Sequence, residues 1–91
     1  MIDIVMSNHF KKDLKLAKKR GFDMKLLDEV VTTLTFGNKL PSHYTQHDLL
    51  GNYVGFKECH IKPDWLLIYK IENSQLELFL FRTGTRADLF D

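Results

Sequence analysis

Hydrophobic positions follow a helical period in the first half of the chain and a strand period in the second half. Residues 1–6 alternate weakly between apolar and polar side chains, which predicts a short first strand. Ser7 or Asn8 can then cap a helix that reaches Arg20, and Gly21 can supply the left-handed residue that ends it. The chain is therefore expected to begin with a strand that leads directly into a helix.

A second helix is predicted between Asp23, which can cap its first turn, and Gly37, before which it ends. One face of this helix is apolar and comprises Met24, Leu27, Val31 and Leu34. Because only about two residues separate the two helices, a tight helical hairpin is expected. A loop follows, from Gly37 to roughly Asn52.

Three strands are predicted after this loop: Tyr53–Ile61, Trp65–Ile71 and Leu76–Thr83. Turn residues join them at positions 62–64 and 72–75. Links this short require antiparallel pairing, with the strand that begins at Trp65 between the other two. The predicted fold class is α+β: an N-terminal strand and a helical hairpin packed on a small antiparallel sheet, in one domain over residues 1–91.

Two of these strands are apolar on both faces, over Trp65–Tyr69 and Leu76–Phe81. The helical hairpin can cover only one face of the sheet. The other face is expected to be covered either by Leu89 and Phe90 near the C-terminus or by a partner chain. This mismatch is a first indication that the protein binds a partner.

The composition is that of a soluble folded protein, with 44% hydrophobic and 27% charged residues. No apolar run approaches the roughly 20 residues that cross a bilayer. The N-terminus has neither the basic region nor the apolar segment of a signal peptide. A cytoplasmic protein without membrane contact is expected.

Cys59 is the only cysteine, which excludes an internal disulfide and a zinc site built from several cysteines. A lone thiol can serve as a nucleophile, but Cys59 lies among strand-forming residues. A small, buried, apolar side chain is therefore the favoured interpretation.

The charge is unevenly distributed, although the net charge is only +1. Basic residues gather within positions 8–25, against only two acidic ones: Lys11, Lys12, Lys15, Lys18, Lys19, Arg20 and Lys25. On a helical projection these lysines face away from the apolar arc of Phe10, Leu14 and Ala17. Such a ridge is typical of a surface that binds a polyanion, and it is equally typical of a solvated helix face.

Polar side chains with catalytic potential gather in the second half of the chain: His47, His60, Asp64, Arg82 and Arg86, with Trp65 and Phe90 as aromatic neighbours. Cleavage of RNA without a metal needs a base, an acid and a cation for the phosphoryl charge. Histidines suit both proton transfers near neutral pH, and an arginine fork matches phosphate oxygens. Trp65 can stack on a base or pack in the core, and both readings stay open.

The hairpin order also predicts where these residues lie. Arg82 is expected on the same strand face as Leu78 and Leu80, and Arg82 and His60 are both expected near the open end of the sheet, within reach of a bound group. A zinc site is a further alternative, because His43 and His47 have the spacing of one helical face, with Asp48 or His60 to complete it, but the cysteines or the H-E-x-x-H pattern of such sites are missing. We expect neither a metal nor another cofactor.

Three separate blocks carry a resemblance to a known family: residues 47–51 (HDLLG), 55–65 (GFKECHIKPDW) and 82–90 (RTGTRADLF). In order and spacing they resemble the C-terminal half of YafQ-type toxins in the RelE/ParE superfamily. The basic first helix and the helical hairpin are similar too, so the resemblance covers nearly the whole chain.

The resemblance implies an endoribonuclease toxin that cuts mRNA in the ribosomal A site and leaves a 2′,3′-cyclic phosphate. It also implies a cognate antitoxin, with operator DNA bound by the toxin–antitoxin complex through that antitoxin. By position, the family's functional residues correspond to His47, His60, Asp64, Arg82 and Phe90, with Trp65 as an accessory residue. Arg82 is expected to clamp the phosphate, His60 and Asp64 to form the base side, and His47 to be a candidate acid. Lys11, Lys15, Lys18 and Lys19 are expected to bind substrate phosphates.

One position departs from the family pattern, because Arg86 stands where YafQ-type toxins usually have a histidine. An arginine cannot transfer a proton at neutral pH, whereas it can neutralise a phosphate. Two other functions therefore remain open. One is a ParE-like toxin that inhibits DNA gyrase as a protein ligand, and the other is an RNA- or ribosome-binding module with weak catalysis.

Overall fold

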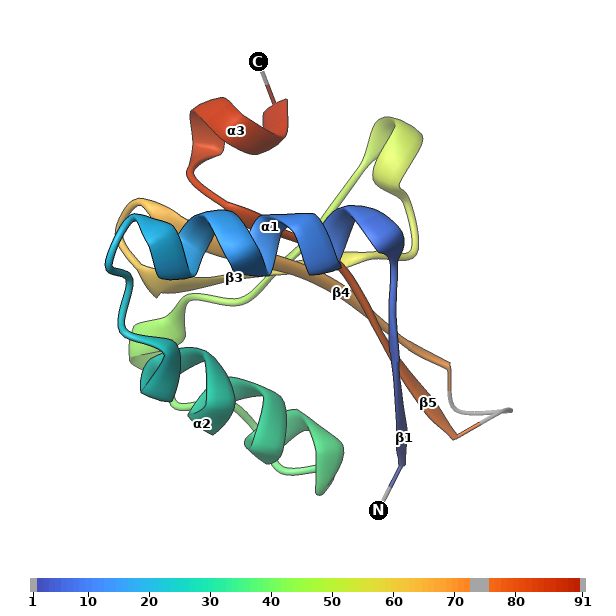
Figure 1. Cartoon of the computed structure of the whole chain (residues 1–91). Coiled ribbons are helices and arrows are strands. Elements are labelled where there is room, and N and C mark those ends of the chain that lie inside the picture. The colour runs from blue at the N-terminus through green and yellow to red at the C-terminus, as the bar shows by residue number, and fades with distance from the viewer. Residues whose placement is uncertain (1, 73–75, 91) are drawn as a thin grey trace.

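The computed structural model describes residues 2–72 and 76–90 and shows a five-stranded sheet with helices on both faces (Figure 1). The strands are β1 (Asp3–Met6), β2 (His47–Asp48), β3 (Lys57–Lys62), β4 (Trp65–Glu72) and β5 (Glu77–Gly84), in the spatial order β1-β5-β4-β3-β2. The helices are α1 (Asn8–Lys19), α2 (Met24–Thr35) and α3 (Arg86–Phe90), with short 3-10 turns η1 (Ser42–Tyr44) and η2 (Gly51–Tyr53). The predicted α+β class is confirmed.

The three long strands pair as predicted, antiparallel and with β4 between β3 and β5. β1 adds to the outer edge of β5 in parallel, so the complete sheet is mixed. β2 forms within the predicted loop and pairs with β3 at the opposite edge. The turn at Pro63 and Asp64 is present, and residues 73–75 of the second predicted turn lie outside the described residues.

The two long helices begin at the predicted residues and end within about one residue of the predicted ends. Ser7 caps α1 by accepting a hydrogen bond from the Phe10 amide, and Asp23 caps α2 by accepting one from the Lys25 amide. Gly21 follows α1 with a left-handed φ of 81°, which costs a glycine little. The helices diverge after this connection, so an apolar groove of about 300 Å³ separates them instead of a tight hairpin interface. We call it the α1–α2 groove.

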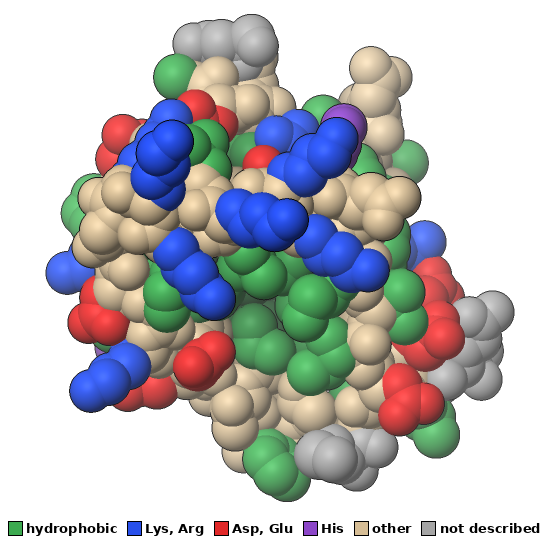
Figure 2. Space-filling model, in the orientation of Figure 1, with side chains coloured by type: hydrophobic (Ala, Val, Ile, Leu, Met, Phe, Trp, Pro, Cys, Tyr) green, Lys and Arg blue, Asp and Glu red, His purple; other side chains and the backbone are tan. Residues whose placement is uncertain are grey.

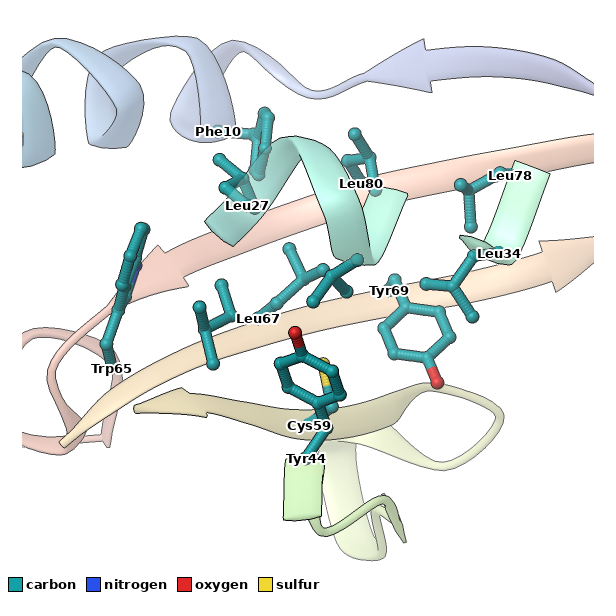
Figure 3. Close-up of a cluster of buried hydrophobic side chains, with 12 residues drawn as sticks. Phe10, Leu27, Leu34, Tyr44, Cys59, Trp65, Leu67, Tyr69, Leu78 and Leu80 are labelled. Carbon is teal, nitrogen blue, oxygen red and sulfur yellow. The ribbon is translucent and has the colours of Figure 1, made fainter. Parts of the chain in front are cut away.

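The larger hydrophobic core lies between these helices and one face of the sheet (Figure 3). We call it the helix-side core, and its members come from α1, α2, η1 and strands β3 to β5: Phe10, Leu27, Val30, Leu34, Tyr44, Cys59, Ile61, Trp65, Leu67, Tyr69, Leu78 and Leu80. Burial raises the pKa of the Cys59 thiol to about 12, so the group stays protonated at neutral pH. The predicted structural role of this cysteine is confirmed.

The opposite face of the sheet carries a smaller core, in which Leu66 and Ile68 of β4 pack against Leu89 of α3. Phe56 and Phe81 pack at its margin, and we call the whole the α3-side core. The chain therefore covers much of this face itself, as the first of the two sequence-based alternatives expected. An uncovered sheet face is no longer an argument for a partner.

A β-bulge in β5 reverses the expected direction of one candidate residue. Tyr69 pairs with Leu80 whereas Ile68 pairs with Arg82, so Phe81 is an extra residue opposite this step. Directly paired residues share a face of the sheet, which puts Arg82 on the side of Ile68. The expectation that Arg82 shares a face with Leu78 and Leu80 is therefore wrong, because the bulge shifts the alternation by one residue.

Helix α1 lies along the edge of β5 at this bulge. The Ser7 hydroxyl donates to the Phe81 carbonyl at 2.6 Å, and the Thr83 amide donates to the Asp13 carboxylate at 3.1 Å. These side chains satisfy backbone groups that β1, which ends at Met6, does not reach. The edge contacts hold α1 against the sheet and away from α2.

Helix α3 is fastened at its start by a reciprocal cap and an ion pair. The Thr85 amide donates to the Asp88 carboxylate at 3.0 Å, and the Asp88 amide donates to the Thr85 hydroxyl at 3.1 Å. Arg20, just after α1, pairs with Asp88 at 2.6 Å. A side chain at Gly84 would meet the Asp88 carboxylate at 3.0 Å, so the close approach of α3 requires glycine there. No helix in the described ranges has the length and hydropathy to span a membrane.

We expect this attachment of α3 to depend on pH. Arg20 and the Thr85 amide lower the pKa of Asp88 to about 2, so the ionised carboxylate stabilises the folded state. That stabilisation is complete above the unfolded pKa of 3.8 and is lost as pH falls through about 2. Asp88→Asn should lower the thermal midpoint at pH 7, and the difference from the parent should be much smaller at pH 2. An equal difference at both pH values, measured by circular dichroism, would contradict this.

Candidate active site

Strand register brings most of the predicted catalytic residues to the sheet face on which α3 packs. His47 pairs with Glu58 and Glu58 with Ile68, while His60 pairs with Leu66. Because paired residues share a face, both histidines lie on the side of the α3-side core. β2 and β3 thus present them next to each other at the edge of the sheet.

The side chains form a connected cluster. The rings of His47 and His60 lie edge to face with their centroids 5.7 Å apart. His60 Nε2 lies 3.9 Å from one Glu58 oxygen, and Arg86 Nη2 lies 3.3 Å from the other. The Arg86 amide lies 3.4 Å from the Asp64 carboxylate and donates to it. We call these five residues, His47, Glu58, His60, Asp64 and Arg86, the β3–α3 cluster.

Glu58 is the residue that the sequence interpretation missed. Its side chain is the central carboxylate of the β3–α3 cluster, yet only 4% of the residue is exposed. Burial of a carboxylate is costly unless a cation and hydrogen bonds compensate, and Arg86 supplies both. The signal was present in the sequence, because Glu58 is two positions before His60 and strand alternation puts both on one face.

The backbone selects the tautomer of His60. Its Nδ1 lies 3.3 Å from the carbonyl oxygen of Pro63, in the turn after β3. A carbonyl can only accept, so the neutral imidazole that makes this contact carries its proton on Nδ1. Nε2 then presents a lone pair toward His47 and Glu58. In this form His60 can accept a proton from a bound substrate.

Arg82 lies outside this cluster and is already held by a carboxylate. Its Nε and Nη2 donate to Asp13 of α1 at 2.7 and 3.2 Å, and this ion pair raises the pKa of the guanidinium. Two strand spacings separate Arg82 from Glu58 across the sheet, which is roughly 10 Å. Asp13 thus orients Arg82 and occupies the Nε and Nη2 edge of its guanidinium group.

Aromatic residues line the space beside Arg86. The Arg86 guanidinium lies 5.4 Å from the centroid of the Phe90 ring, which is close enough for a cation–π contact. Phe90 also meets Tyr53 of η2 edge to face at 5.8 Å. With 38% of its surface exposed, Phe90 retains a free face for a ligand.

Trp65 is the exception among the predicted site residues. It is only 3% exposed, its indole N–H donates to the Thr83 hydroxyl at 2.9 Å, and its ring packs against Phe22 at 4.9 Å. No ring face is left for a nucleobase. Trp65 therefore belongs to the core, and the base-stacking alternative is not supported.

The basic residues of α1 lie apart from the β3–α3 cluster, on the surface of the helix. Figure 2 shows lysine and arginine side chains along α1, above a hollow floored by hydrophobic side chains. This hollow is the α1–α2 groove. It is lined by the apolar residues Phe10, Leu14, Leu27 and Leu80 and bordered by Lys18 and Asp28. The exposed lysines on this helix are Lys11, Lys12, Lys15, Lys18 and Lys19.

Three residues of the cluster also have the arrangement of metal ligands. One ligand atom each from His47, Glu58 and His60 lies within 4.8 Å of the other two, and two imidazoles with a carboxylate suit zinc or copper. This set differs from the zinc alternative drawn from the sequence. His43 instead stacks on Tyr44 at 4.2 Å, and Asp48 pairs with Lys57 at 2.8 Å.

Three comparisons with known proteins each match bacterial toxins over nearly the whole chain. The family model described as the bacterial toxin of type II toxin-antitoxin system, YafQ, matches residues 2–91. The mRNA interferase toxin YafQ of Escherichia coli K12 is 43% identical over 89 residues, which cover 97% of this chain and 95% of that protein.

Solved structures agree. A metal-bound toxin from Helicobacter pylori superposes with a TM-score of 0.93 at 46% identity, covering 99% of this chain and all of the other. A chain in the crystal structure of the E. coli DinJ-YafQ complex superposes with a TM-score of 0.90 at 41% identity, and the match covers all of this chain and all of that one.

Proposed function

The chain belongs to the YafQ family of toxins from bacterial type II toxin-antitoxin systems, and we propose that it is an endoribonuclease that cuts mRNA in the ribosomal A site. The observation that carries this proposal is the β3–α3 cluster. Two histidines, two carboxylates and an arginine from β2, β3, the turn after β3 and α3 lie around one side of the sheet. A protein that acts only as a ligand of another protein has no need of that arrangement.

His60 is the base of the proposed reaction. Its Nε2 accepts the proton of the ribose 2′-hydroxyl, and the 2′-oxygen attacks the adjacent phosphorus. The Pro63 carbonyl keeps the proton on Nδ1, and the Glu58 carboxylate 3.9 Å away stabilises the imidazolium that forms. Asp64 belongs to the same side of the site through its contact with the Arg86 amide.

His47 and Arg86 complete the chemistry. The P–O bond to the 5′-oxygen breaks, and protonated His47 donates to that oxygen, which gives a 2′,3′-cyclic phosphate and a free 5′-hydroxyl. Arg86 is fixed by Glu58 and Phe90, and it stabilises the charge on the phosphoryl oxygens in the transition state. Arg82 holds a neighbouring phosphate through the part of its fork that Asp13 does not use.

The surface of α1 supports contact with the ribosome. Its exposed lysines face solvent along one helix and provide an electrostatic footprint for phosphate backbones. Lys11, Lys15, Lys18 and Lys19 therefore bind RNA phosphates away from the cut bond. Such contacts position a substrate without selecting its sequence.

The α1–α2 groove supports a cognate antitoxin as the partner. Its floor is apolar, Lys18 lies at its rim, and the neighbouring lysines of α1 continue the positive charge. An amphipathic acidic segment fits a groove of this chemistry. Binding there also neutralises α1, and the complex reaches operator DNA through the antitoxin.

The first test is cleavage in the presence of a chelator that removes zinc and copper but leaves the Mg²⁺ that ribosomes need. Purified protein added to translating ribosomes should still cut mRNA, because the proposed chemistry needs no metal bound to the protein. His60→Gln should lower the rate by about 10² to 10⁴-fold, as loss of a proton-transfer group does. Arg82→Gln, which can still hydrogen-bond Asp13, should lose most of the activity, whereas the surface variant Lys39→Ala should retain it.

Primer extension maps the cut ends, and a thermal melt confirms that each variant is folded. Undiminished cutting by folded His60→Gln would overturn the assigned base, and undiminished cutting by Arg82→Gln would remove Arg82 from the mechanism. Gyrase inhibition without RNA cleavage would favour the ParE-like alternative.

Replacement of Arg86 tests its role as a fixed cation. Arg86→His should cut progressively less well than the parent protein as pH rises from 6 to 8, because a histidine loses its charge in this range. The matched control, Arg86→Lys, keeps a charge and should show no such pH-dependent loss. A gain in cutting by Arg86→His at neutral pH would show instead that the parent lacks a proton donor.

Antitoxin binding is tested in the α1–α2 groove. Leu14→Glu should weaken the affinity for the antitoxin encoded beside this protein at least about 10-fold, because it puts an acid on the apolar floor. Met24→Gln changes the same groove more gently from α2 and should weaken binding too. Leu16→Glu, on the exposed side of α1, should leave the affinity unchanged. Equal affinities by calorimetry would place the antitoxin elsewhere.

A further inference from the structure

A second cavity opens beside the catalytic histidines. It has a volume of about 690 Å³, and His47 and His60 form part of its wall. Asp64 does not line it and instead borders a separate hollow of about 490 Å³ with Thr85. Lys62 lies at the rim of both. The cavity is thus continuous with the β3–α3 cluster but extends past the histidines, away from Asp64.

The lining of this cavity has the chemistry of a nucleotide site. Leu26, Ile61 and Pro63 provide apolar surface, and burial of a flat aromatic ligand against such a surface is favourable. His43 is exposed, and its ring lies against the buried Tyr44 ring with centroids 4.2 Å apart and a 37° tilt. An exposed ring supported from behind by a buried one offers its other face for stacking.

The rim supplies the complementary charge. Lys62 is exposed in the last position of β3, and among the described residues it makes no ion pair. Its amine can therefore reach a phosphate at the mouth of the cavity. A nucleobase on His43 and a phosphate on Lys62 are the two parts of one nucleotide.

We propose that this cavity is a nucleotide subsite, in which the base next to the scissile bond stacks on His43 and its phosphate pairs with Lys62. The proposal rests on the proposed ribonuclease function and adds to it the position of the flanking nucleotide. Apart from the two histidines that it shares with the β3–α3 cluster, the residues of this subsite take no part in bond breaking.

Binding of short single-stranded RNA tests the subsite separately from cleavage. The probe is a trinucleotide with a 2′-deoxyribose at its first and central positions, so neither phosphodiester has an adjacent 2′-hydroxyl and the probe cannot be cut by 2′-hydroxyl attack. It is compared with two versions in which either the first or the last base is removed and the sugar is kept as in the complete probe. Affinities are measured by NMR titration, and the His43 ring signals report stacking directly.

One of the two abasic probes should bind about 5- to 100-fold more weakly than the complete trinucleotide, as loss of one stacked base does. His43→Ala should weaken the complete probe by a similar factor and leave that abasic probe unaffected. Lys62→Ala should weaken all three probes together. The matched control His9→Ala, an exposed histidine on α1, should change nothing.

Several outcomes overturn the subsite: no base-dependent binding to the parent protein, equal weakening of complete and abasic probes by His43→Ala, or unshifted His43 signals. These failures are distinguishable from failure of the proposed function. If the protein binds the base on His43 but cuts no RNA, the subsite proposal stands and the ribonuclease proposal fails. If the protein cuts RNA but His43→Ala leaves the affinity for the complete probe unchanged, the ribonuclease proposal stands and the subsite proposal fails.

Discussion

The contact of Asp13 with the edge of β5 is the interaction on which the rest of the arrangement depends. One carboxylate accepts hydrogen bonds from Arg82 Nε at 2.7 Å, from Arg82 Nη2 at 3.2 Å and from the Thr83 amide at 3.1 Å. It satisfies an edge amide that would otherwise need water, and it fixes α1 beside the bulge at Phe81. With α1 held there, α2 diverges, and the α1–α2 groove remains open.

A second carboxylate, that of Glu58, holds α3 on the opposite face of the sheet. Glu58 is buried in the sheet, and its partner Arg86 is supplied by α3, so the helix that covers the α3-side core also provides the cation of the site. A buried carboxylate without that partner would be strongly destabilising. The position of α3 is therefore favoured by three contacts: the packing of Leu89, the cap formed by Thr85 and Asp88, and the charge of Glu58.

Sequence reasoning identified the elements well because their signals are local. The caps at Ser7 and Asp23 and the apolar run in β4 depend on neighbours within a few residues, and α1, α2 and β4 appeared where these signals put them. The site was harder. His47, His60, Asp64 and Arg86 were recognised by residue type and resemblance, whereas Glu58 was passed over, and Trp65 was left between core and site until its 3% exposure showed that it packs in the core.

The sequence by itself determined the two long helices, the three long strands, the central place of β4 and most of the polar residues that can take part in chemistry, but neither β2 nor α3. Only the tertiary structure decided which face each residue occupies. The bulge that turns Arg82 is stabilised by Asp13, which is 69 positions away in the chain, and Glu58 meets Arg86 across 28 positions. Contacts between such distant residues exist only once the chain has folded, because no local period or cap encodes them.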